Sequence, residues 1–330
     1  MLTRRTLPLL FAGACGFAAI AACTLDVNKY SLETAPVVEA GADSDTPIVQ
    51  LPDASVPYAS LRFEAVAMLP HTAEAFELRV VDTNDKVVAK MVLDRVIPNP
   101  STNSNDFSLF AKNFIPSVTP PYRLDFWFDH NQIPGTPPTK TPDKKYTKPG
   151  KDEDHSWRRV LSDPLKPGVA YRSPTFTVYF PHDQNWDNLN IDPQGREIDF
   201  NALSLAAFNL KVINAPDYLG KMFEYRVTAH ATGQVVGVYR RTALDTGEQT
   251  LQITDIVDES TEYDVTAFVD MNADQIFNAG EPSWSTNVRS TSGDFEGTLN
   301  LGTADKVPID NGNGSLPQLV FDDAGVFVSH

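Results

Sequence analysis

Two seven-residue stretches decide the fold: 122–128, which reads YRLDFWF, and 263–269, which reads YDVTAFV. In both, apolar residues at every second position alternate with residues that are mostly polar, which is the period of a β-strand with one buried face. Similar short runs are separated by clusters of Pro, Gly, Asn and Asp, such as 98–101 and 246–247. The 25 prolines of the chain also disfavour helix interiors. The sequence therefore predicts an all-β protein whose antiparallel sheets pack face to face.

The surroundings of these two strands repeat in the same order. FELRV at 76–80 corresponds to FEYRV at 223–227, and KVV at 86–88 corresponds to QVV at 234–236. Collinear matches that differ only in loop length indicate an internal duplication. Each copy is then expected to hold about seven strands in an immunoglobulin-like or transthyretin-like sandwich. The further matched positions are Tyr122 with Tyr263, Asp129 with Asp270, Asn131 with Asn272 and Trp157 with Trp284.

The N-terminus has the layout of an export signal, in which two arginines precede an apolar run from Leu7 to Ala22. The run falls short of the ~20 apolar residues that a comfortable membrane span needs. It ends in IAAC at 20–23, which resembles the lipobox of bacterial lipoproteins. The resemblance implies cleavage before Cys23, a lipid on the Cys23 thiol, and an extracytoplasmic, membrane-anchored protein. Thr24 after the cysteine favours the outer membrane in a Gram-negative host.

Composition narrows the classes of partner. The chain has 27 basic and 43 acidic residues and a net charge of −16, which repels nucleic acid. An excess of carboxylates suits calcium, a hard cation that prefers oxygen ligands. The two cysteines are Cys15, inside the predicted signal, and Cys23. A mature chain would keep a single, acylated thiol, so no disulfide is expected.

These observations predict a domain order that alternates folded units with connecting segments. A small, acidic and aromatic-poor stretch is typical of a flexible tether. The C-terminal tail contains an apolar group at 316–321 that could add an edge strand. The predicted parts are a lipoprotein signal peptide at 1–22, the tether at 23–57, sandwich unit 1 at 58–182, a linker at 183–199, sandwich unit 2 at 200–304 and the tail at 305–330.

The segment 270–281 reads DMNADQIFNAGE and carries an oxygen-bearing side chain at positions 1, 3, 5, 9 and 12. This spacing resembles the calcium loop of EF-hand and dockerin-type proteins. Two features depart from those families: Gln275 stands at position 6, where glycine makes a turn with positive φ, and a strand instead of a helix enters the loop. The alternative is an ordinary polar turn, because Asp and Asn also bond nearby backbone. The resemblance implies the calcium ligands Asp270, Asn272, Asp274, the backbone carbonyl of Ile276, Asn278 and Glu281.

The first unit carries a weaker version of the same pattern. Asp129 and Asn131 occupy the first two ligand positions, but Ile133 stands at the fifth. An ion there would need Asp152, Glu153 or Asp154 to fold back from the end of a long loop. The weaker metal candidates are therefore Asp129, Asn131, Asp152 and Asp154.

The sequence lacks the common motifs of catalytic and nucleotide-binding sites. It contains no HExxH, no GxSxG and no phosphate-binding glycine loop. The six histidines are widely separated, and His155 beside Asp154 is expected to be a solvated loop residue. The four tryptophans are expected in the cores, although exposed ones could stack on sugar rings.

The leading hypothesis is a non-enzymatic lipoprotein whose calcium-stabilised sandwiches serve binding or scaffolding. Its expected partners are the membrane, through the lipid anchor, and a protein or glycan ligand, with no nucleic acid. Two alternatives come from other classes. One is a carbohydrate-binding cell-surface module that uses exposed tryptophans, and the other is a carboxylate-dependent hydrolase that uses Asp152 or Asp154 with His155.

Overall fold

The structure is a computed structural model that describes most of the two predicted sandwich units. The predicted signal peptide, tether and tail edge strand lie outside the described residues, as do Cys23, Asn131 and Asp152. Within the described part of the chain, no helix is long and apolar enough to cross a membrane. The described residues are 58–98, 105–116, 122–130, 144–146, 154–161, 170–172, 175–177, 186–189, 200, 203, 205–259, 261–278, 280–289 and 293–302.

The first sandwich consists of two sheets. One contains β3, β2, β5 and β6 in that order, with antiparallel pairing throughout. The other pairs β4 antiparallel to β1, and β7 and β8 run parallel to β1 on its far side. The strands are β1 (Tyr58–Val66), β2 (Phe76–Val81), β3 (Val87–Leu93), β4 (Phe107–Pro116), β5 (Tyr122–Phe128), β6 (His155–Leu161), β7 (Ala170–Arg172), β8 (Phe176–Thr177) and β9 (Asp187–Asn188).

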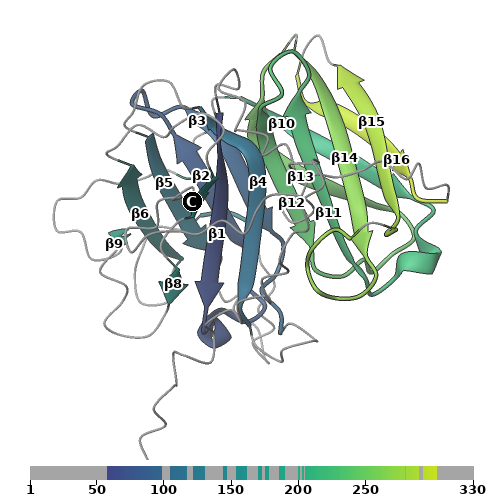
Figure 1. Cartoon of the computed structure of the whole chain (residues 1–330), viewed down its shortest axis with the longest axis horizontal. Coiled ribbons are helices and arrows are strands. Elements are labelled where there is room, and N and C mark those ends of the chain that lie inside the picture. The colour runs from purple at the N-terminus through teal and green to yellow at the C-terminus, as the bar shows by residue number, and fades with distance from the viewer. Residues whose placement is uncertain are drawn as a thin grey trace, which may run out of the picture. The chain divides into compact units, whose positions relative to one another are not determined.

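The second sandwich repeats this arrangement, as the green and yellow strands of Figure 1 show. Its larger sheet contains β12, β11, β14 and β15 in that order. Its smaller sheet pairs β13 antiparallel and β16 parallel to the central β10. The strands are β10 (Ala206–Ile213), β11 (Met222–Ala229), β12 (Val235–Arg241), β13 (Gln249–Val257), β14 (Glu262–Asp270), β15 (Ser283–Arg289) and β16 (Phe295–Asn300).

Irregular features recur at matching places in the two sandwiches. A short 3-10 turn joins the first two strands of each, η2 (Leu69–His71) and η4 (Pro216–Tyr218). Ala67 and Asn214, with φ of 60° and 58°, lead into these turns. Both β1 and β10 shift register against their antiparallel partners within the first residues of pairing, between Ala59 and Leu61 and between Ala206 and Phe208. The recurrence of bulge and turn, as well as strand order, is what a duplicated unit produces.

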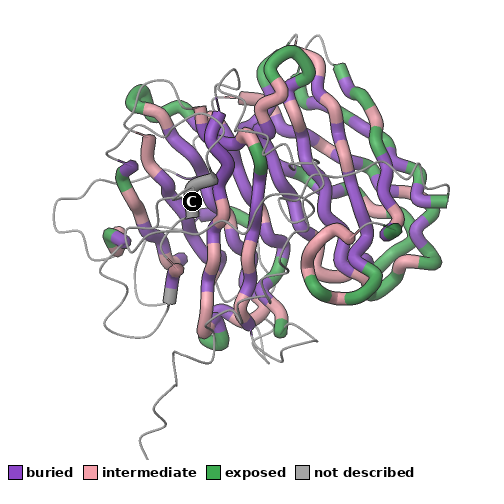
Figure 2. The backbone as a smooth tube through the Cα atoms, viewed as in Figure 1, coloured by how far each residue is buried: buried purple, intermediate pink, exposed green. Residues whose placement is uncertain are grey.

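The alternation in 122–128 separates two faces of β5. Leu124, Phe126 and Phe128 belong to the first core and have no exposed surface. Phe126 lies within an aromatic cluster, with ring centroids 4.9 Å from Phe176 and 5.3 Å from Trp157. Figure 2 shows the resulting buried strands in the interior of each sandwich. The corresponding residues of the second core are Val265, Ala267, Val269 and Trp284.

The two sandwiches share one sheet. Edge strands β3 and β12 pair in parallel, with Lys90 opposite Gly237 and Leu93 opposite Arg240. Among the described strands this gives a nine-stranded sheet in the order β15-β14-β11-β12-β3-β2-β5-β6-β9 (Figure 1). The predicted all-β sandwich class is confirmed. The pairing is not purely antiparallel, because β7, β8 and β16 and the junction between β3 and β12 pair in parallel. The segment predicted as a linker, 183–199, contains β9, which pairs with β6.

Side chains reinforce the junction between β3 and β12. The Asp94 carboxylate accepts a hydrogen bond from the Thr242 amide at 2.8 Å and pairs with Arg241 at 2.9 Å. Burial raises the pKa of Asp94, and the guanidinium of Arg241 opposes that shift. The side chain of Gln234 donates to the carbonyl of Val88 at 3.1 Å. Main-chain and side-chain bonds together therefore hold the two edges in one register.

Each unit buries charged groups on the face of the shared sheet that points away from that unit's own core. In the FELRV segment, Arg79 donates to Glu77 at 2.6 Å and Lys90 lies 3.4 Å from the same carboxylate. Burial lowers the pKa of Lys90 to about 8, although the Glu77 carboxylate acts in the opposite direction. In the FEYRV segment, burial alone would raise the pKa of Glu224, but Arg240 and Arg226 lower it below its ordinary value. The repeated E-x-R motif thus forms an ion pair in each sandwich, mostly buried in the first and buried in the second.

Candidate functional site

The predicted calcium loop follows β14 directly and ends before β15. The carboxylate of Asp270 accepts hydrogen bonds from the backbone amides of Ala273 at 2.6 Å and Gln275 at 2.7 Å. Gln275 has a φ of 65°, in the left-handed region. The residue at position 6 therefore makes the turn that a glycine would make there, so the sequence departure at this position leaves the turn in place.

The remaining oxygen side chains of the loop form one hydrogen-bonded network. Asp274 accepts the Ile276 amide at 2.9 Å through one oxygen. Its other oxygen accepts the side-chain amides of Asn272 at 3.0 Å and Asn278 at 2.7 Å. Glu281 reaches back across the loop and accepts the backbone amides of Met271 at 2.7 Å and Asn278 at 2.8 Å. All six predicted ligand residues therefore belong to one hydrogen-bonded loop.

Three carboxylates share this loop. Burial raises the pKa of Glu281, and the negative charges of Asp270 and Asp274 raise it further, while two backbone hydrogen bonds act against the rise. The charges of Asp270 and Asp274 therefore act unfavourably on an ionised Glu281.

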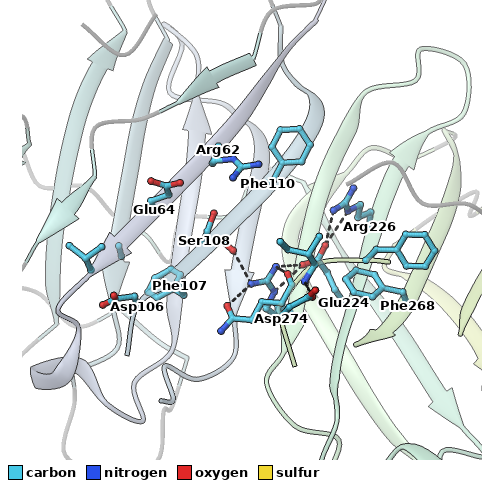
Figure 3. Close-up of a pocket in the computed structure, with 16 residues that line it drawn as sticks. Arg62, Glu64, Asp106, Phe107, Ser108, Phe110, Glu224, Arg226, Phe268 and Asp274 are labelled. Atoms are coloured by element: carbon cyan, nitrogen blue, oxygen red, sulfur yellow. Dashed lines mark hydrogen bonds and ion pairs between the residues drawn. The ribbon is translucent and has the colours of Figure 1, made fainter. Parts of the chain in front are cut away.

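The same loop forms one wall of a pocket of ≈ 310 Å³ at the junction of the sandwiches. Figure 3 shows Arg62, Glu64 and Ser108 on the side of β1 and β4, facing Glu224 and Asp274 on the opposite side. The lining contains both aromatic rings and charged groups. The aromatic lining residues are Phe107, Phe110, Phe268 and Phe277.

Arg240 connects three walls of this pocket. Its guanidinium bonds Glu224 twice, at 2.9 Å and 2.7 Å. It also donates to the carbonyl of Ser108 on β4 at 2.8 Å, and to the backbone carbonyl of Gln275 at 3.2 Å. One buried side chain therefore ties β12 to the first sandwich and to the calcium-type loop.

No family model and no curated protein matches the chain. Several solved structures are distantly similar. A candidate adhesin from Bacteroides ovatus has 13% identity and a TM-score of 0.20, over 82% of this chain and 91% of that one. A candidate polysaccharide-binding protein from Bacteroides thetaiotaomicron has 10% identity and a TM-score of 0.21, over 72% of this chain and 78% of that one.

The Bacillus anthracis TIE protein has 10% identity and a TM-score of 0.18 over 73% of this chain. This chain spans 34% of the length of that protein. TM-scores this low carry no conclusion about activity, ligand or partner.

The weaker metal candidates of the first unit have other hydrogen bonds in the structure. Asp129 is buried, and one of its oxygens accepts the Lys144 amide at 2.7 Å. Asp154 is fully buried and accepts the His130 amide at 2.8 Å. Both carboxylates therefore hold the backbone around the end of β5. A calcium ion at this place stays a prediction, because Asn131 and Asp152 lie outside the described residues.

All four tryptophans are buried: Trp157 and Trp186 lie in the first core and Trp284 in the second, as expected, while Trp127 packs in a separate small cluster with Tyr146 and Phe200. Trp127, Trp157, Trp186 and Trp284 are each no more than 5% exposed. A sugar-binding platform needs aromatic faces open to solvent. The hypothesis of a carbohydrate-binding module built on exposed tryptophans is therefore wrong.

The expectation that His155 is an isolated, solvated residue is also wrong. His155 lies beside His71 and His130, and candidate ligand atoms of the three side chains are all within 4.8 Å of one another. The three residues come from different segments, so no local spacing in the sequence indicates this cluster. A comparison of the two repeated units could have indicated the cluster, because the first unit has histidines at three positions where the second has none.

Proposed function

We propose that this protein is a non-catalytic, membrane-anchored binding protein in which calcium at 270–281 fixes one wall of the junction pocket. The observation that carries the proposal is the double role of the loop. Its oxygen side chains form one hydrogen-bonded network around Gln275, which has a positive φ, and residues 274–277 of the same loop line the pocket. A protein or glycan ligand held there would then bind in a calcium-dependent way.

Charge and ligand chemistry support calcium in particular. The loop offers carboxylate, amide and backbone carbonyl oxygens, the ligand set that Ca²⁺ takes in flexible geometry. Calcium would replace the backbone amides that now occupy the carboxylate oxygens, and its two positive charges would offset most of the charge of the three carboxylates. Extracellular calcium sites function with dissociation constants of roughly 10⁻⁴ to 10⁻³ M.

Excess calcium is expected to raise the Tm of the full-length chain by several degrees relative to chelator, because an ion bound to the folded state alone shifts unfolding by mass action. The rise should shrink as pH falls, because protonation of Glu281, whose pKa is raised, competes with calcium. Differential scanning fluorimetry over a calcium and pH series measures both effects.

Two variants localise the calcium effect. Asp274→Asn and Glu281→Gln should lose the calcium-dependent rise, since each replaces a negatively charged ligand of the ion by a neutral amide. Asp217→Asn removes an exposed acid from η4 of the same sandwich and should keep the whole rise. An equal response in Asp217→Asn and Glu281→Gln would contradict a calcium site at the loop.

The membrane anchor is proposed from the lipobox resemblance at Cys23. Labelled palmitate should enter the wild-type chain during expression in a bacterium with lipoprotein processing, and Cys23→Ser should abolish the label and release the protein from the membrane fraction. Cys15→Ser is the matched control because it keeps the lipobox cysteine. Label retained in Cys23→Ser would refute this part of the proposal.

A further inference from the structure

Three histidines meet at one end of the first sandwich. His71 ends η2, His130 follows β5, and His155 begins β6. The rings of His130 and His155 stack with centroids 4.5 Å apart, and the ring of His71 lies 5.4 Å from that of His155. Half of the six histidines in the chain therefore lie in this histidine cluster.

A buried carboxylate orients two of the three rings. Glu74 has no exposed surface, and its two oxygens contact the Nδ1 atoms of His71 and His130, the latter at 2.6 Å. With Glu74 ionised, each Nδ1 donates its proton, which leaves the lone pair on Nε2. Metal-binding histidines are typically held in this way by a carboxylate that accepts from the other ring nitrogen.

The histidine cluster packs against the aromatic rings of Phe128 and Trp157. His71 is 1% exposed, and its ring stacks on Phe128 at 4.3 Å with 23° between the planes. Trp157 meets the edges of His71 and His155 at 6.2 Å and 6.0 Å. His130 and His155 are partly exposed. The site is therefore anchored at His71 and accessible from the side of the other two rings.

The second sandwich shows that the fold itself does not require these residues. Strand pairing aligns Phe76 with Phe223, and Trp157 with Trp284, so the remaining positions can be matched. The turn of η4 presents Tyr218, whose ring meets Trp284 at 5.6 Å, in the place of His71. The other counterparts are Lys221 for Glu74, Met271 for His130 and Pro282 for His155.

We propose that His71, His130 and His155 bind a zinc-class divalent transition metal through three imidazole nitrogens, with Glu74 as the positioning residue. Imidazole suits zinc, copper and nickel, whereas calcium prefers oxygen, so this site and the calcium-type loop select different ions. Three nitrogens at about 2.0–2.1 Å from one tetrahedral zinc lie roughly 3.3 Å apart. The rings of His130 and His155 now stack with 18° between their planes, so metal binding requires at least one of them to turn its nitrogen toward the shared ion.

Zinc chloride titrated into metal-stripped, full-length protein in a calorimeter should show one saturable site of micromolar or tighter affinity. His130→Ala and His155→Ala should each weaken zinc binding at least tenfold. Glu74→Gln should weaken it about 10–100-fold, because it leaves the ligands in place and removes the carboxylate that orients them. Bound cobalt should give the visible absorption of a tetrahedral nitrogen site in the wild type and lose it in His155→Ala.

Two controls separate this site from other sources of metal affinity. His230→Ala removes an exposed histidine that pairs with Asp264 on the second sandwich and should leave zinc affinity unchanged. Glu281→Gln should do the same, which distinguishes failure of this proposal from failure of the calcium proposal. Circular dichroism verifies that each variant is folded. Zinc affinity that is absent in the wild type, or unchanged in folded His130→Ala and His155→Ala, would overturn the proposal.

Discussion

Replacing Arg240 by methionine should lower the free energy of unfolding by about 3 kcal/mol, because breaking a buried ion pair leaves its partner's charge incompletely compensated. Arg240 is 4% exposed and supplies two of the hydrogen bonds that Glu224 accepts. Its loss also removes the donor to Ser108 on β4 and the donor to Gln275 in the calcium-type loop. Guanidinium denaturation of the full-length chain, followed by circular dichroism, measures the change.

Arg95→Met is the matched control for this prediction. Arg95 is exposed on the segment that follows β3, so its replacement should change stability by less than about 0.5 kcal/mol. If Arg240→Met unfolds at the same denaturant concentration as Arg95→Met, the connection between the sandwiches through Arg240 contributes nothing to stability.

Phe126→Ala should cost about 3–5 kcal/mol, the usual loss when a buried phenylalanine is cut back to alanine and a cavity remains. The Phe126 ring has no exposed surface and lies 4.9 Å from Phe176 and 4.9 Å from Trp186. Ala267 stands at the corresponding position of the second core, also fully buried. An alanine is therefore compatible with the backbone of the strand, and the cost comes from the packing of the first core.

Val160→Ala on the neighbouring β6 is the control, because Val160 is 51% exposed. It should change the unfolding midpoint very little. A small effect of Phe126→Ala in the same denaturation assay would mean that the first core collapses around the missing ring.

Local sequence patterns were sufficient where the structure itself is local. The alternation in 122–128 places Leu124, Phe126 and Phe128 inside because successive residues of a strand face opposite sides. The calcium-type loop could be recognised because its candidate ligands lie within twelve consecutive residues. Even the unexpected Gln275 takes the turn that this position requires, since the surrounding hydrogen bonds hold it there.

Features that depend on distant segments could not be predicted in this way. The parallel contact of β3 with β12 involves two edge strands whose sequences look like those of any sandwich strand. The histidine cluster is assembled from a turn, a strand end and a strand start, and Glu74 joins two of its rings only after folding. Residues that are isolated along the chain can therefore form a site when a hairpin and a turn meet at one end of a sandwich.

The parallel pairing of β16 with β10 has a mechanical consequence for the second sandwich. β10 and β16 run parallel and side by side, paired from Phe208 with Phe295 to Ile213 with Asn300. A pull on the leading end of β10 and the trailing end of β16 acts along the strands in opposite directions. The hydrogen bonds between β10 and β16 are then loaded in shear, so they bear the force together instead of breaking one after another. The second sandwich should therefore resist unfolding when force is applied between these two strand ends.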